Sequence, residues 1–179
     1  MDLLQLALDC GAYKADYLTQ NQVVLSAAFR PICENNSCGQ YGKTYMCPPA
    51  VGVITDLMDQ VRQYDRAMLY QTVGQLEDSF DYEGMMEAGI YHIEVCQRIQ
   101  KALQRDERKL LHIAGGGCHL CSRCAIQDDQ PCRYPEQALG SMSAYGVDVY
   151  STCRNTTLHY INGQNTVTYF GMVLFSEYI

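Results

Sequence analysis

The apolar residues of this chain alternate between short runs typical of strands and longer stripes at helical spacing. Strand-like runs are predicted at 23–29, 67–73, 109–114, 147–152 and 166–175. Helical patterns are predicted at 3–10, 54–64, 81–105 and 135–143. The longest pattern repeats at steps of three and four, which predicts a buried stripe made of Met85, Met86, Gly89, Ile90, Ile93, Cys96 and Leu103.

The order of these elements predicts the fold class. Strands and helices alternate up to residue 114, which favours βαβ units and an α/β fold with a mainly parallel central sheet and flanking helices. The length of 179 residues suits a single domain, 1–179. Two cysteine-rich loops, 30–52 and 115–135, each follow a predicted strand. Ligands bind beyond the carboxyl ends of the strands in open α/β sheets, so we expect both loops at one edge of the sheet.

The loop at 115–135 carries four cysteines in the spacing C-x2-C-x2-C-x7-C. Three thiols at successive two-residue gaps can wrap one face of a compact inorganic cluster, and this run is typical of 4Fe–4S binding in bacterial ferredoxins. The three glycines at 115–117 let the backbone approach such a body closely. The predicted ligands are Cys118, Cys121, Cys124 and Cys132. Zinc on the same cysteines stays open as the alternative cofactor, although zinc commonly uses two C-x2-C pairs set well apart.

The loop at 30–52 carries Cys33, Cys38 and Cys47 in the spacing C-x4-C-x8-C. Pro48 biases Cys47 towards an extended backbone, which suits a ligand held rigidly at a loop exit. These three thiols are predicted ligands of a second metal site, but they do not complete four positions.

The remaining cysteines divide into one candidate ligand and two core residues. Cys153, in a polar stretch after a predicted strand, is the candidate for the eighth ligand. Cys10 and Cys96 lie on apolar helical patterns and are expected to be small buried hydrophobes. Two other arrangements stay open: Cys132 completes the first group instead, or one iron has no cysteine ligand and binds a small molecule.

Composition and charge narrow the class of protein. The net charge of −7 and the pI of about 4.9 make nucleic acid an unexpected partner. No apolar run is long enough to span a membrane, and residues 1–5 lack the features of a secretory signal. We therefore expect a cytoplasmic protein in a reducing compartment. There, clustered cysteines are more often metal ligands or catalytic groups than disulfides.

Three segments carry a resemblance to a known family. They are CGQYGKTYMCPP at 38–49, CHLCSRCAIQDDQPCRYPEQALGSMSAYGVDV at 118–149 and NGQNTVTYFGMVLF at 162–175. The chain resembles a family of uncharacterised, cysteine-rich proteins that are predicted to bind metal and occur mostly in anaerobic bacteria and archaea. The match covers about 30–175, with Tyr45 and Met46 where a Trp is expected near Cys47. The resemblance implies metal binding, with iron–sulfur as the expected form, and it brings no known reaction.

These features predict an iron–sulfur protein with one or two 4Fe–4S clusters. The expected role is electron transfer, or redox partnering, in anaerobic metabolism. One alternative is an enzyme, or an accessory protein to one, that binds a small molecule at an incompletely ligated cluster. Another is a structural zinc-binding interaction module. The expected partner is a redox protein or a small-molecule ligand, and the sequence gives no oligomeric state.

Overall fold

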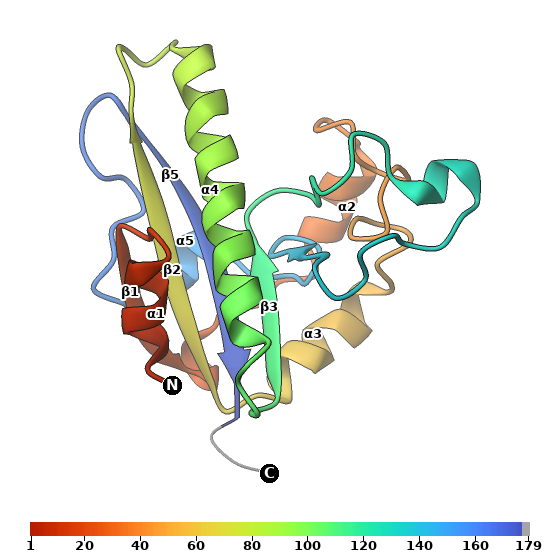
Figure 1. Cartoon of the computed structure of the whole chain (residues 1–179), viewed down its shortest axis with the longest axis horizontal. Helices are drawn as coiled ribbons and strands as arrows, with labels where there is room; N and C mark the ends of the chain where they lie inside the picture. Colours follow the sequence, from red (N-terminus) through yellow and green to blue (C-terminus); the bar gives the residue numbers. More distant parts are fainter. Residues whose placement is uncertain (177–179) are drawn as a thin grey trace.

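A five-stranded sheet forms the centre of the protein, with helices on both of its faces (Figure 1). The computed structural model describes residues 1–176. The strands are β1 (Lys14–Thr19), β2 (Arg66–Gln75), β3 (Leu110–Ala114), β4 (Gly140–Ser141) and β5 (Thr166–Phe175), in the spatial order β1-β2-β5-β3-β4. The helices are α1 (Leu3–Asp9), α2 (Phe29–Glu34), α3 (Ile54–Arg62), α4 (Tyr82–Leu103) and α5 (Val149–Cys153), with short 3-10 turns η1 (Gln20–Gln22) and η2 (Ala125–Asp128).

The sheet is mixed and mostly antiparallel, so the prediction of a mainly parallel sheet is wrong. β5 pairs antiparallel with both β2 and β3, and β1 pairs antiparallel with β2. Within residues 1–176 the parallel ladder is the short one between β3 and β4. The cause is the last strand: β5 inserts between β2 and β3, the two strands that α4 connects.

One face of the sheet packs against α1 and α4. Met68 and Tyr70 of β2 point into this layer, where they meet Val95 and Ile99 of α4. The Tyr70 ring fits because its neighbour on β5 is Gly171: a Cβ at that position would lie 2.1 Å from the Tyr70 hydroxyl oxygen. The close approach therefore requires glycine.

The buried stripe of α4 differs in part from the prediction. Cys96 and Leu103 are buried as expected, but Met86 and Ile90 are 51% and 56% exposed. The buried face instead includes His92, together with Val95 and Ile99. The pattern of apolar residues did not predict that His92 is buried, because histidine is polar. Hydrogen bonds inside the protein satisfy its ring and allow the burial.

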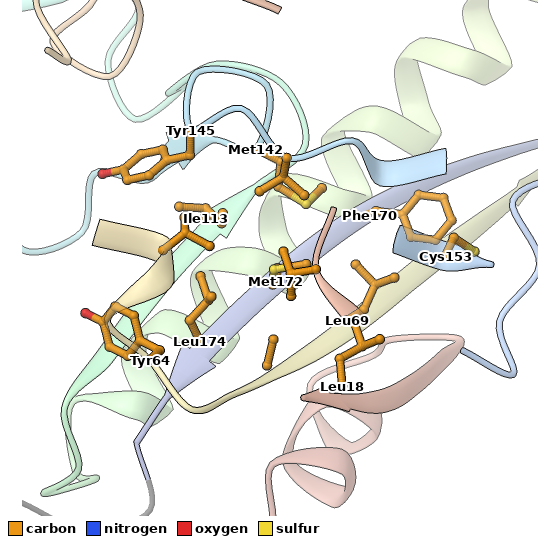
Figure 2. Close-up of a cluster of buried hydrophobic side chains, with 14 of the residues drawn as sticks. Leu18, Tyr64, Leu69, Ile113, Met142, Tyr145, Cys153, Phe170, Met172 and Leu174 are labelled. Carbon is orange, nitrogen blue, oxygen red and sulfur yellow. The ribbon is translucent and has the colours of Figure 1, made fainter. Parts of the chain in front are cut away.

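The opposite face of the sheet packs against α3, α5 and the connecting segments that carry Met142 and Tyr145 (Figure 2). Leu69 of β2 and Met172 of β5 point into this layer. Their direct neighbours along the strands, such as Tyr70, point to the other face, towards α4. The period of two along these strands places one apolar set on each face, so both faces of the sheet are buried.

Helices 3–10, 54–64 and 81–105 and strands 67–73, 109–114 and 166–175 are confirmed, with small shifts at their ends. The strand predicted at 23–29 is wrong: its residues make an isolated bridge, between Leu25 and Val147. The strand predicted at 147–152 is wrong, because Asp148 caps helix α5 there by accepting from the Ser151 N–H. The helix predicted at 135–143 is replaced by turns and the short strand β4.

The two cysteine-rich loops lie together beyond the end of β3, on the side of the sheet away from β1 (Figure 1). The first loop starts within α2, and the second follows directly from β3. Among residues 1–176, no helix is both long and apolar enough to cross a membrane.

Candidate metal centre

All four cysteines of the second group line one cavity of about 130 Å³, which we call the tetrad cavity. The members of this group are Cys118, Cys121, Cys124 and Cys132. The chain reaches them from β3 through Gly115, where a Cβ would lie 2.8 Å from the Phe170 carbonyl oxygen, and Gly116, which has a φ of 80°. The glycines thus allow the close packing and the left-handed turn that send the loop away from the sheet.

Side chains hold the second loop to the first. The Tyr45 hydroxyl donates to the Gln130 carbonyl oxygen at 2.8 Å, and the Gln127 amide donates to the Lys43 carbonyl oxygen at 3.1 Å. These bonds place residues 43–45 against the tetrad cavity, so that Thr44 and Tyr45 form part of its wall. The two loops therefore build one site, although about 60 residues separate them along the chain.

Thr44 places a hydrogen-bond donor at the wall of the tetrad cavity. Its side chain is 5% exposed, and its hydroxyl lies close enough to the Cys47 sulfur to lower the pKa of that thiol. Metal-bound sulfur is an acceptor, so a buried hydroxyl at this wall fits a sulfur-ligated metal group.

The three cysteines of the first group line a second and larger cavity of about 330 Å³, which we call the three-cysteine cavity. Cys33 lies on α2, Cys38 is exposed and Cys47 is buried. The other side chains on the wall, apart from Pro48, are polar: Gln40, Tyr41, His119, Ser141 and Ser143. No fourth cysteine of residues 1–176 reaches this cavity.

The two cavities are neighbours. Gln40 and His119 line both of them. The Gly117 backbone, next to Cys118 of the tetrad, packs against Cys47 so closely that a Cβ on Gly117 would lie 3.5 Å from the Cys47 sulfur. Metal groups in the two cavities would therefore lie side by side.

The thiol pKa values reflect burial and this crowding. Burial raises the pKa of Cys47, the nearby Thr44 hydroxyl lowers it, and the thiols of Cys38, Cys33 and Cys118 raise it. Burial also raises the pKa of Cys118, while the N–H groups of Leu120 and Leu139 lower it by donating to the sulfur. These backbone donors would stabilise a thiolate ligand.

Cys153 lies apart from the other predicted ligands. Its side chain is 1% exposed within the core layer between the sheet and α5, and its thiol lies 3.5 Å from the Leu158 carbonyl oxygen (Figure 2). Cys96 is buried against α4 and the sheet, while Cys10 is partly exposed beside the same layer. The structure thus brings seven of the eight predicted ligands to the two cavities.

The four thiols of the tetrad surround a space; they do not converge on one point. Within residues 1–176, no three His, Cys, Asp or Glu side chains are arranged to hold a single metal ion. Sequence reasoning missed the parts of the site that come from outside the loops, above all Ser141 and Ser143 at the end of β4. Their nearness depends on the short ladder between β3 and β4, for which the sequence offers no signal.

Comparison with known proteins agrees with a metal site. The profile of a family described as "Predicted metal-binding protein (DUF2284)" matches residues 16–175, which include every cysteine of the two cavities. No curated protein and no solved structure matches the chain. Because the match spans most of its length, the chain belongs to this family of predicted metal-binding proteins.

Proposed function

We propose that this protein carries iron–sulfur clusters and transfers electrons. One 4Fe–4S cluster is held by Cys118, Cys121, Cys124 and Cys132, and a second by Cys33, Cys38 and Cys47. The observation that carries the proposal is that all four thiols of the C-x2-C-x2-C-x7-C run line a single cavity, whose wall includes the buried side chain of Thr44.

The shape of the tetrad cavity favours a cluster over zinc. A structural zinc ion needs four ligand atoms within about 2.3 Å of one centre. The four thiols here surround about 130 Å³ of space, which suits a polynuclear body with a separate iron for each thiolate. Zinc on the same residues remains the competing assignment that metal analysis decides.

The neighbouring cavities support a role in electron transfer. A 4Fe–4S cluster supplies one-electron chemistry when bound, at a potential set by hydrogen bonds to sulfur and by exposure. The protein's own contribution is visible at three donors: the Leu120 and Leu139 N–H groups beside Cys118, and the Thr44 hydroxyl beside Cys47. Cys38 is exposed, so electrons would enter or leave from a redox protein docked at the first loop.

The same features support a reducing setting. All ten cysteines are free thiols, including those that lie near one another in the loops. Such thiols persist in a reducing compartment, so the proposed location is the cytoplasm of a cell with anaerobic metabolism.

A second candidate function has its own observation. The three-cysteine cavity offers three thiols to a group with four ligand positions, and it is larger than the tetrad cavity by about 200 Å³. This asymmetry favours an enzyme, or an accessory protein to one, that binds a small molecule beside the first cluster.

Metal and sulfide analysis tests the proposal. Protein purified without oxygen should be brown and contain about four iron atoms and four sulfides for each cluster. Cys124→Ser should lose the iron and sulfide of one cluster and keep those of the other. Stoichiometric zinc without sulfide, in protein never exposed to oxygen or chelator, would overturn the proposal in favour of the zinc module.

A further inference from the structure

We propose that His119 is the fourth ligand of the cluster held by Cys33, Cys38 and Cys47, and that it binds through Nε2 of its ring. The inference rests on the proposed function, because it needs a metal group in the three-cysteine cavity. It adds to that function the missing ligand and a reason for the two clusters to differ in reduction potential. With His119 as a ligand no iron is left open, which suits electron transfer and leaves the second candidate function without its binding position.

The three-cysteine cavity lacks one ligand, and His119 lies beside it. In a fully ligated 4Fe–4S cluster each iron takes one protein ligand. Four thiols line the tetrad cavity, whereas three line its neighbour. His119 lines both cavities, but the thiols of the tetrad leave no position for it there. The ring is therefore available to the cavity in which one position is unfilled.

The glycine turn after β3 places the ring nitrogen at the wall of the three-cysteine cavity. Gly116 lines this cavity and does not line the tetrad cavity. A Cβ on Gly116 would lie 4.0 Å from Nε2 of His119, and a Cβ on the next residue, Gly117, would lie 3.5 Å from the Cys47 sulfur. Two adjacent residues of one turn thus bring the ring nitrogen and one of the three thiols to the same wall.

The His119 ring has a nitrogen that nothing else uses. It makes no hydrogen bond, ion pair or ring contact within the part of the chain that the structure describes. The buried histidines differ, since His92 contacts the Thr72 hydroxyl and the Phe170 carbonyl oxygen through its two ring nitrogens. A histidine that binds metal through Nε2 keeps Nδ1–H for an outer partner such as water. The exposed position of His119 allows this.

The other polar side chains of this wall are poorer ligands for iron. Imidazole suits iron, whereas an amide oxygen such as that of Gln40 suits Mg²⁺ or Ca²⁺. Tyr41 and the two serines would each have to lose a hydroxyl proton before they bind as anions. The hydroxyl oxygens of Ser141 and Ser143 also lie 3.2 Å apart and bond to each other. His119 is therefore the side chain of this wall best suited to join the three thiolates.

Ligation by His119 gives the two clusters an order of reduction. A neutral imidazole in place of a thiolate removes one negative charge from the cluster, and histidine ligands raise the reduction potential of Rieske centres relative to all-cysteine centres. The cluster in the three-cysteine cavity should therefore be reduced before the cluster in the tetrad cavity.

Pulsed electron paramagnetic resonance tests the assignment. Protein that carries ¹⁵N-labelled histidine, loaded with iron and sulfide without oxygen and then reduced, should show a ¹⁵N coupling of the size of a direct iron–nitrogen bond. His119→Ala should lose this coupling, and His159→Ala, at another exposed histidine, should keep it. Cys124→Ser, which retains the cluster of the three-cysteine cavity, should also keep it. His119→Cys should lose the coupling, keep full iron and sulfide, and lower the potential of one cluster alone.

The outcomes separate this inference from the proposed function. Iron and sulfide for two clusters, without a coupling to histidine nitrogen, would overturn the inference alone. The inference also fails if the coupling survives in His119→Ala, or if it disappears in Cys124→Ser while the remaining cluster is intact, because the ring would then bind the cluster of the tetrad cavity. Protein that takes up zinc without sulfide would overturn both.

Discussion

The Tyr70 hydroxyl oxygen lies 2.7 Å from Nε2 of His112, inside the layer between α4 and the sheet. On its other side the same oxygen lies 3.0 Å from the Cys96 sulfur. Gln100 donates its amide to the Glu136 carbonyl oxygen, so its own oxygen faces Nδ1 of His112 at 3.0 Å. The Tyr70 hydroxyl donates to the Cys96 sulfur, and it therefore joins the His112 ring and the Cys96 side chain in one buried hydrogen-bond network.

Removal of the central hydroxyl should destabilise the fold and leave the metal site alone. Tyr70→Phe removes the hydroxyl that contacts Nε2 of His112 and donates to the Cys96 sulfur, and both of these groups are buried. We expect the free energy of unfolding to fall by about 1–3 kcal/mol, measured by urea denaturation. Tyr13→Phe, at a ring that is 55% exposed, is the control and should change stability by less than about 0.5 kcal/mol. Loss of iron from Tyr70→Phe would contradict the expectation that the hydrogen bonds around Tyr70 are independent of the metal centre.

The buried histidines should make stability fall in mild acid. Burial lowers the pKa of His112 to about 3 and of His92 to about 4, and His92 nearby lowers that of His112 further. The unfolded chain protonates both near pH 6.5, whereas the folded protein does not until the pH is much lower. Stability is therefore complete above about pH 6.5 and falls below it, by about 1.4 kcal/mol per pH unit for each histidine until its folded pKa is reached.

Urea denaturation at about pH 7 and about pH 5.5 measures this dependence. His112→Gln should be less stable at neutral pH and should lose less stability than the unsubstituted protein on going to the lower pH. His159→Gln, at an exposed site, should keep the full loss. An identical loss in all three proteins would mean that protonation of other groups, such as carboxylates, controls the acid response.

The fold was predictable from the sequence only where local pattern decides it. The helix at 54–62 and the strand at 166–175 follow from periodic apolar positions, and they are present. β1 was missed because its sequence, KADYLT, has few apolar residues. The segment forms a strand because it pairs with β2. The mostly antiparallel pairing of the sheet depends on β5 inserting between β2 and β3, and no local signal encodes this long-range pairing.

For the candidate site, cysteine spacing identified the second group as one unit, and its four members line one cavity. Spacing does not give neighbours from distant segments, so the contributions of Thr44, Ser141 and Ser143 came only from the structure. The choice of Cys153 relied on its polar sequence neighbours, but α5 turns its side chain into the core. A cap at Asp148 decides that local conformation.

The position of each cysteine predicts which substitutions remove metal. Cys96→Ala and Cys153→Ala should keep full iron and sulfide, because both side chains lie in core layers. Each should cost about 1–2 kcal/mol of stability, since a buried thiol is replaced by a smaller group. Cys121→Ala should lose one cluster's iron. Iron loss in Cys153→Ala, with the fold intact by circular dichroism, would make Cys153 a ligand after all.

The Thr44 hydroxyl should raise the reduction potential of the cluster that Cys47 holds. A donor to sulfur stabilises the reduced cluster, which carries more negative charge, so loss of the donor should favour the oxidised form. Thr44→Val keeps the shape of the side chain and removes only the hydroxyl, whose oxygen is buried beside the Cys47 sulfur. For one electron, about 1 kcal/mol corresponds to about 40 mV, so we expect a potential lower by tens of millivolts at unchanged iron content. Thr55→Val, on the exposed surface of α3, is the matched control and should leave the potential unchanged in a redox titration followed by absorbance. A potential that is equal in Thr44→Val and Thr55→Val would show that this hydroxyl does not donate to the cluster.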